Sequence, residues 1–332
     1  MRKLLNIALL ATLIFVACTS EDISLDKQDD KSIEIFLSVS NYQISNASSR
    51  STRSIHAGSN EEKEVENLYL FLFDTNGSVE KYNVTGTSFS GGTWSVEEGK
   101  ITLNLTQITA AIRDVYIVAN YPSSLQGALD GVTTVSELLT VAHNQGTPWS
   151  PDLGTPILMT GNVNGHNFIS NRQLNNVPLT RAVAKLELNI KLKAKRQSTP
   201  TIEQGVPGSG NTSTVHQYGY QFVDFDKNTY AYKQTQKVDD LESFANMVNF
   251  TETDDVAKYI LTGDVVTGLT LITYLNERDS HNGVNPRSSV ELRLPYNSGG
   301  PLPPPEFGDE IYKLQLPTII ERNTWYVYDI EI

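Results

Sequence analysis

Residues 67–73 read Asn67-Leu-Tyr-Leu-Phe-Leu-Phe73, so both faces of a strand formed by this run would be apolar. A strand buried on both faces is typical of the centre of a layered β-protein. The turn-forming sequence Asp74-Thr-Asn-Gly77 follows at once, ahead of a second strand expected at 78–84. This stretch therefore predicts a central antiparallel strand followed by a tight turn.

Other short segments on both sides of this run also alternate between apolar and polar residues. Ala184–Leu192 places Leu186, Leu188 and Ile190 on one face of a strand and charged or amide side chains on the other. Further strands are expected at 33–40, 100–105, 114–120, 218–225, 269–275, 290–295 and 325–332. Many short strands separated by turns indicate β-sandwiches.

One helix is expected among these strands, at Val135–His143, where Thr134 and Glu137 have the spacing of a capping box. At 332 residues the chain is long enough for two domains of ~100–200 residues each. We therefore predict an all-β protein with two β-sandwich domains in tandem and one or two short helices. The domains are expected at 54–176 and 177–332.

The overall composition excludes several classes of function. The chain has 26 Lys and Arg against 38 Asp and Glu, a formal net charge of −12. Nucleic acids and anionic membranes are bound through clustered Lys and Arg, so neither is expected as a partner through a basic surface. A single cysteine can form neither an internal disulfide nor a cysteine-rich zinc site.

The sequence offers no pattern for catalysis, a cofactor or a metal. The five histidines, none with a His or Cys at metal-binding spacing, are His56, His143, His166, His216 and His281. Motifs of serine hydrolases, zinc proteases and phosphate-binding loops are absent. Asp224-Phe-Asp-Lys-Asn228 begins like a calcium loop, but Thr229 and Thr235 stand where that loop needs Gly and Glu, so a plain turn is favoured. We therefore expect no enzyme activity and no cofactor.

The N-terminus has the features of an export signal. Met1-Arg-Lys3 is followed by an apolar run to Ala17, shorter than the ~20 residues of a membrane-spanning helix. Cys18 follows Phe15-Val-Ala17, which is similar to the end of bacterial lipoprotein signals, where the cysteine becomes lipidated. An ordinary signal peptide with an incidental cysteine is the alternative. We predict a signal at 1–17, lipidation of Cys18, and export to the outer membrane.

Five blocks of sequence follow one another in order along nearly the whole chain. They are the signal with strand Ile33–Ser40, Val65–Gly77, Arg113–Asn120 with Ile157–Gly161, Val177–Leu188, and Ile320–Ile332. Their order and spacing resemble the fimbrillins of Bacteroidetes, the FimA-type subunits of type V pili. The resemblance implies two transthyretin-like β-sandwich domains, in agreement with the pattern of strands.

The resemblance also implies assembly by donor-strand completion. In such subunits an arginine-directed protease removes the first strand, and a strand of a neighbouring subunit fills the apolar groove left behind. Here the propeptide would be 18–53, with cleavage after Arg50 or Arg53 in a small, polar stretch that suits a protease. The alternative is that both arginines are solvated linker residues. The inward face of the removable strand would be formed by Ile33, Ile35, Leu37 and Val39.

The last block bears on the role within a pilus. Stalk subunits of this family continue past the block matching Asn323–Ile332 with donor strands, whereas this sequence ends at Ile332. We therefore expect a structural and adhesive tip subunit of a cell-surface fimbrium. Its expected partners are other fimbrial subunits, an arginine-specific protease, and a glycan or protein receptor on host or bacterial surfaces. Alternatives are a stalk or anchor subunit, or a surface lipoprotein that binds glycan through exposed tryptophans from among Trp94, Trp149 and Trp325.

Overall fold

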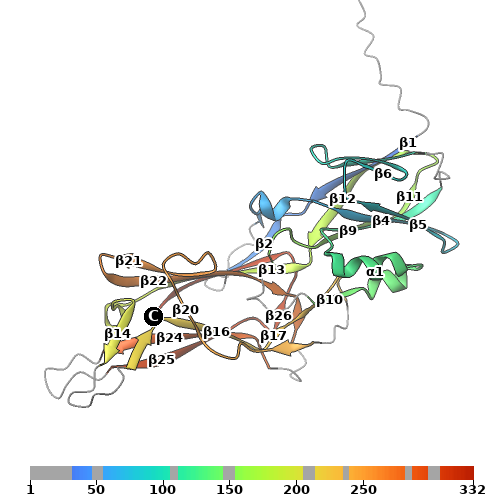
Figure 1. The fold of residues 1–332 in the computed structure, drawn as a ribbon. Helices are drawn as coiled ribbons and strands as arrows, with labels where there is room; N and C mark the ends of the chain where they lie inside the picture. The colour runs from blue at the N-terminus through green and yellow to red at the C-terminus, as the bar shows by residue number, and fades with distance from the viewer. Residues whose placement is uncertain are drawn as a thin grey trace, which may run out of the picture.

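Strands dominate the chain, and Figure 1 shows them gathered into two bodies. The computed structural model describes residues 32–46, 55–104, 111–144, 154–204, 214–234, 239–280, 286–297 and 307–332. The predicted signal at 1–17, Cys18, Arg50, Arg53, Trp149 and His281 lie outside these ranges. The architecture is all-β with few helices, as the sequence predicts.

The first body is built on one nine-stranded sheet. In spatial order its strands are β5 (Val79–Val84), β4 (Leu68–Asp74), β9 (Ile112–Ala119), β11 (Met159–Asn167), β12 (Gln173–Arg181), β1 (Ser32–Val39), β8 (Lys100–Asn104), β7 (Gly92–Ser95) and β6 (Ser88–Phe89). Val84 of β5 and Trp94 of β7 belong to one buried cluster although their strands lie near opposite ends of this order. The sheet therefore curves around a single apolar core.

The run at 67–73 is buried on both faces, as predicted, because alternate side chains of β4 face different layers. Its leucines enter the core inside the sheet. Its aromatic residues lie beneath the two helices, α1 (Ser123–Gly131) and α2 (Val135–Leu139). This second cluster contains Tyr69, Phe71, Phe73, Leu125, Leu129 and Leu138. At β4 the sheet thus lies between two apolar clusters, the core of the first body on one face and the helices on the other.

The second body packs a six-stranded sheet against a four-stranded one. The first of these contains β21 (Ala257–Thr262), β22 (Val265–Asn276), β13 (Val183–Lys191), β27 (Thr324–Glu331), β2 (Tyr42–Asn46) and β3 (Ile55–His56) in spatial order. The other contains β20 (Val248–Asn249), β16 (Gly219–Val223), β24 (Ser289–Asn297) and β25 (Phe307–Gln315). Leu186 and Leu188 of β13 share a core with Phe222 of β16 and Leu292 of β24. The two sheets thus form the predicted sandwich.

Shorter elements complete the described ranges. The two-stranded pairs are β10 (Ala142–Asn144) with β18 (Asn228–Tyr230), β14 (Thr201–Gln204) with β15 (Thr214–Gln217), β17 (Phe225–Asp226) with β19 (Leu241–Glu242), and β23 (Arg278–Asp279) with β26 (Ile319–Ile320). Short 3₁₀ turns occupy Glu61–Lys63 and Ala194–Arg196.

The helices differ in part from the prediction. The capping box of Thr134 and Glu137 is present, but the helix ends at Leu139, and His143 lies in β10. The prediction ran too far because Val141 and Ala142 fit a helical pattern as well as a strand. Helix α1 was not predicted. Within the described ranges, neither of these helices nor any other is long and apolar enough to cross a bilayer.

The chain passes from the first sheet to the second at Ala182. β12 ends at Arg181 and β13 begins at Val183. Val177 and Leu179 are fully buried in the core of the first body. The predicted boundary between 176 and 177 is therefore too early, because the alternating side chains of β12 serve the first sheet rather than the second.

The two bodies share buried contacts beyond the covalent chain. β10 pairs with β18 across the boundary. Tyr232 reaches from the second body into the helix-covered cluster of the first. Its hydroxyl oxygen lies 2.9 Å from the carbonyl oxygen of Ile117 and 3.0 Å from that of Gly161. A buried hydroxyl with these partners fixes the position of the second body on the first.

Candidate functional site

The first described strand, β1, lies inside the first sheet rather than at its edge. It runs parallel to β12 and antiparallel to β8. Its backbone is hydrogen-bonded on both sides, for example from Leu37 N to Gly99 O at 2.8 Å and from Glu34 N to Arg172 O at 2.9 Å. Without β1, the facing edges of β12 and β8 would present unpaired N–H and C=O groups. The sheet therefore needs a strand at this position.

The four predicted inward residues of β1 do face the core, but they fill it unequally. Ile33 and Ile35 are fully buried, opposite Leu103 and Ile101 of β8. Leu37 and Val39 pack against the same core and are only partly buried. The first half of β1 thus fits its groove closely, and the second half leaves part of its apolar surface exposed.

The outward face of β1 is mainly polar, with Phe36 beneath Lys100, and makes contacts that are part-buried or exposed. The Glu34 carboxylate accepts a hydrogen bond from Gln173 Nε2 at 2.9 Å and lies 3.7 Å from Lys100 Nζ. Ser38 Oγ donates to Asn176 Oδ1 at 2.7 Å. Exposed pairs of this kind contribute ~0–1 kcal/mol each. The strand is therefore held mainly by its backbone and its inward side chains.

The chain then crosses to the second body, where it forms β2. β2 pairs in parallel with β27, placing Ile44 opposite Trp325, and in antiparallel with β3. Figure 1 shows the blue strands β1 and β2 in different bodies. No strand was predicted ahead of Arg50 and Arg53 apart from 33–40, so β2 is an addition to the prediction. The predicted propeptide thus contributes a strand to each body.

Arg181 occupies the junction between the bodies and is fully buried. Its guanidinium carbon lies 4.1 Å from the centre of the Tyr42 ring. The guanidinium group donates to Ser40 O at 2.7 Å, Glu62 O at 2.9 Å, Asn323 Oδ1 at 3.0 Å and Ala57 O at 3.4 Å. One side chain therefore joins the β1–β2 connection, the segment after β3, the 3₁₀ turn and the residue before β27.

Glu62 is the acidic counterpart of this junction and is 1% exposed. Its carboxylate accepts from Ser59 N at 2.7 Å, lies 2.9 Å from Lys185 Nζ, and accepts from the Tyr274 hydroxyl at 2.8 Å. Burial acts to raise the pKa of Glu62. The hydrogen bonds from Ser59, Lys185 and Tyr274 outweigh burial and leave this pKa below its ordinary value.

This lowered pKa predicts a pH-dependent contribution to stability. A carboxyl group whose pKa is lower in the folded state stabilises the fold above its unfolded pKa of about 4.3, and this contribution is lost as the pH falls through the folded value. Thermal unfolding from pH 7 downward should show the wild type losing melting temperature relative to Glu62→Gln in that acid range. Glu97→Gln, at an exposed turn, serves as the matched control. A constant difference between wild type and Glu62→Gln at all pH values would contradict this assignment.

Sequence reasoning missed both junction residues. Arg181 lies within a block quoted for the family resemblance, but local alternation does not reveal what a residue between two strands contacts. The available signal was a lone arginine between two apolar strands, in Leu179-Thr-Arg181-Ala-Val183. A charged residue in such a place needs buried partners.

The two tryptophans within the described ranges do not form an exposed platform for glycan. Trp94 is only 4% exposed and belongs to the first core. Trp325 is half-buried, with Lys185 Nζ 4.2 Å from its ring centre and the His56 ring 4.5 Å away, centre to centre. The predicted alternative is wrong for these two residues, because both rings are used in packing.

The aspartate of the stretch that begins like a calcium loop serves as a turn residue, as does Asp254 further along the chain. Asp226 Oδ1 accepts hydrogen bonds from Asn228 N at 2.8 Å and Asp240 N at 3.3 Å, which closes the turn that was favoured over a calcium loop. Asp254 Oδ1 accepts from Val256 N at 2.7 Å. Within the described ranges, no three His, Cys, Asp or Glu side chains are grouped so that they could hold a metal ion.

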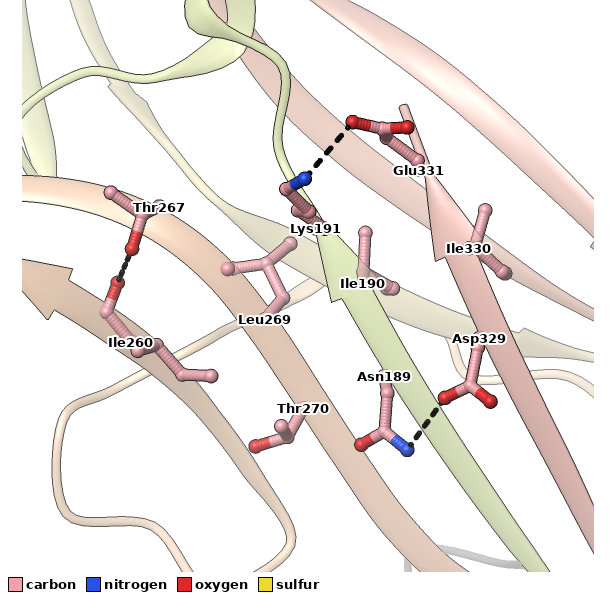
Figure 2. Close-up of a pocket in the computed structure, with 11 residues that line it drawn as sticks. Asn189, Ile190, Lys191, Ile260, Thr267, Leu269, Thr270, Asp329, Ile330 and Glu331 are labelled. Carbon is pink, nitrogen blue, oxygen red and sulfur yellow. Dashed lines mark hydrogen bonds and ion pairs between the residues drawn. The ribbon is translucent and has the colours of Figure 1, made fainter.

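A hollow of about 440 Å³ lies on the outer face of the six-stranded sheet, away from the junction (Figure 2). Figure 2 shows two polar pairs spanning β13 and β27 there: Lys191 with Glu331 at 3.4 Å and Asn189 with Asp329 at 3.2 Å. Both pairs are exposed, so they contribute little to stability. The groove around β1 is the stronger candidate site because the fold depends on what occupies it.

The fold defines a class: an all-β protein of two bodies, each completed by a strand from the N-terminal segment. Residues 35–248 match the family described as "Major fimbrial subunit protein (FimA)", and residues 182–331 match "Minor fimbrium tip subunit MfA4, C-terminal". The chain belongs to the FimA-type fimbrial subunit family, and the resemblance inferred from its five sequence blocks is confirmed.

A relative found by sequence supports this membership, and two solved structures were also matched. A curated protein, "Minor fimbrium tip subunit MfA4" of Porphyromonas gingivalis (strain ATCC 33277), is 40% identical over 348 residues, which cover 100% of this chain and 99% of the relative. The crystal structure of a cell adhesion protein from Bacteroides eggerthii DSM 20697 has a TM-score of 0.51 at 15% identity, covering 91% of this chain and 87% of the other; it supports the fold alone. The tip fimbrial protein Mfa3 of P. gingivalis, with C-terminal truncation, has a TM-score of 0.49 at 14% identity, covering 90% and 94%.

Proposed function

We propose that this chain is a structural and adhesive tip subunit of a cell-surface fimbrium, joined to other fimbrial subunits by strand replacement. The role at the tip is supported by the relationship to a minor fimbrium tip subunit, at 40% identity over the full length of both chains. The observation that carries the mechanism is the position of β1, a central strand supplied by sequence ahead of the predicted cleavage sites.

Cleavage after Arg50 or Arg53 would separate β1 and β2 from the rest of the chain. Once this segment departs, the edges of β12 and β8 that faced β1 have unpaired backbone groups. Leu103 and Ile101 then line an uncovered apolar groove. A strand from another subunit would restore both the hydrogen bonds and the burial. This chemistry requires only backbone pairing and apolar contact, so we assign the protein no catalytic role.

Before cleavage the subunit would be held at the outer membrane through lipid on Cys18. Each buried CH₂ of an acyl chain contributes ~0.8 kcal/mol, and stable anchoring requires more than one chain. Cleavage beyond Cys18 would release the subunit from this anchor and expose the groove in the same step. We therefore place the mature protein on the fimbrium and its lipidated precursor in the outer membrane.

Mass spectrometry of fimbriae sheared from cells tests this function most directly, because it reports both membership and the mature N-terminus. We expect the protein in the fimbrial fraction with an N-terminus at Ser51 or Ser54. Gold-labelled antibody should mark fimbrial ends. An arginine-specific protease should produce the same N-terminus from the purified precursor.

The matched control replaces both Arg50 and Arg53 with alanine and should leave the precursor uncut. Label along the whole fimbrium would indicate a stalk subunit. Surface material that still begins at Cys18 would indicate an anchor. Absence from sheared fimbriae together with binding to a glycan array would favour the surface lipoprotein instead.

A further inference from the structure

The groove that holds β1 contains unfilled space at one end. A cavity of about 300 Å³ lies beside the second half of the strand and is lined by Leu37 and Val39. Across it lie Trp94 of β7 and Leu179 of β12, with Gly99 at the turn before β8. Ile33 and Ile35, in contrast, are fully buried. The resident strand therefore fills its groove at one end only.

The pairing of β1 changes at the same place. Ile35 lies opposite Leu174 of β12 and Leu37 lies opposite Val177, so the register shifts by one residue between them. Leu37 remains bonded on its other side, from its N–H to Gly99 O at 2.8 Å. The backbone is thus held in position while the Leu37 side chain is too short to close the space.

One residue that lines this cavity also carries a buried polar atom without a partner. Trp94 is 4% exposed, and its indole N–H makes no hydrogen bond to the residues that the structure describes. Burying a donor without an acceptor costs ~1–3 kcal/mol. The cavity opens toward Val96, which is 55% exposed, and toward the charged residues Glu97 and Glu98. The cavity is therefore lined by apolar side chains next to β1 and by charged residues, including Lys63 and Glu64, elsewhere.

We propose that this cavity is the receiving pocket for a large apolar side chain of the donor strand that replaces β1. The proposal rests on the proposed function, since it needs a strand from another subunit. A donor strand with an aromatic residue at the position of Leu37 would bury more apolar surface than β1 does. The exchange of β1 for the donor would then be favourable in free energy, because the precursor strand is the poorer fit.

Synthetic peptides test the pocket on the protease-cleaved protein. A peptide with the sequence of residues 32–46 is compared with its Leu37→Phe form as competitors for a labelled 32–46 peptide bound in the groove. We expect the Leu37→Phe peptide to bind about fivefold more tightly, since it buries additional ring surface. The Ile35→Phe peptide is the matched control and should bind at least tenfold more weakly, because Ile35 has no free space.

The full-length precursor supplies a second measurement that needs no cleavage. Leu37→Phe should raise its melting temperature by about 2 °C, whereas Ile35→Phe should lower it. Equal or weaker binding by the Leu37→Phe peptide, or a lowered melting temperature for the Leu37→Phe precursor, would overturn the pocket. If no peptide, including the wild-type sequence, enters the cleaved protein while the precursor measurements hold, strand replacement fails and the role of the cavity as a receiving pocket is overturned with it, although the space beside Leu37 is real.

Discussion

Replacing Arg181 with methionine is expected to lower the free energy of unfolding by about 3–5 kcal/mol, the range for removing one member of a buried polar cluster. Methionine keeps much of the apolar stem and removes every donor. Four acceptors from four segments, two of them buried, then lose their hydrogen bonds, and the Tyr42 ring loses its cation. The loss is large because Arg181 is fully buried, and Glu62 and Asn323, which supply two of its acceptors, are buried with it.

Chemical denaturation of the precursor, followed by far-ultraviolet circular dichroism, measures this effect. The matched control is Lys195→Met, which removes a positive charge from an exposed site and should change stability by less than about 0.5 kcal/mol. The loss of unfolding free energy in Arg181→Lys should lie between those of Arg181→Met and Lys195→Met. An ammonium group keeps the charge but cannot reach all the acceptors that the guanidinium group contacts. A loss below 1 kcal/mol for Arg181→Met would mean that the junction is not held by this side chain.

Replacing Ile35 with alanine is expected to destabilise the precursor by about 2–5 kcal/mol, because it leaves a cavity in a closely packed core. Ile35 is fully buried opposite Ile101, within the half of β1 that fills its groove. Ser38→Ala, on the outward face of the same strand, is the matched control and should have little effect. Denaturant unfolding of the three precursors provides the comparison.

The Ile35→Ala effect should be confined to the precursor. Once a donor strand has replaced β1, residue 35 is no longer part of the folded subunit, so wild type and variant should unfold alike. A difference that persists in protease-cleaved, donor-completed subunits would show that β1 stays in place and would contradict strand replacement.

Much of the fold could be predicted from local patterns. Run 67–73 is continuously apolar and run 184–192 alternates with a period of two residues. Both patterns predict strands independently of the rest of the sequence. The inward face of β1 followed from the same rule. Thr134 and Glu137 predicted the start of α2 because a capping box depends on residues three apart.

The remainder depends on contacts between distant parts of the sequence. β2 is short and polar, with Gln43 and Ser45 on its exposed positions, and becomes a strand because β27 lies beside it. Helix α1 contains Gly127 and Gly131, which weaken a helical pattern, and it is stabilised by covering the aromatic face of β4. The roles of Arg181 and Glu62 arise only where several segments meet, so no local pattern indicates them.

The pairing of β2 with β27 also has a consequence for the order of folding. It joins the two ends of the chain, and the bond from Asn323 Nδ2 to Asn41 O at 2.7 Å spans 282 positions of sequence. Contacts of such high separation form late, because the whole intervening chain must be available and the entropy of closing the loop must be overcome first. During synthesis β2 therefore has only the two-residue strand β3 beside it until residues 324–331 have been added. The six-stranded sheet of the second body therefore stays incomplete until β27 has been synthesised, so the proposed export of the precursor would begin before this sheet can close.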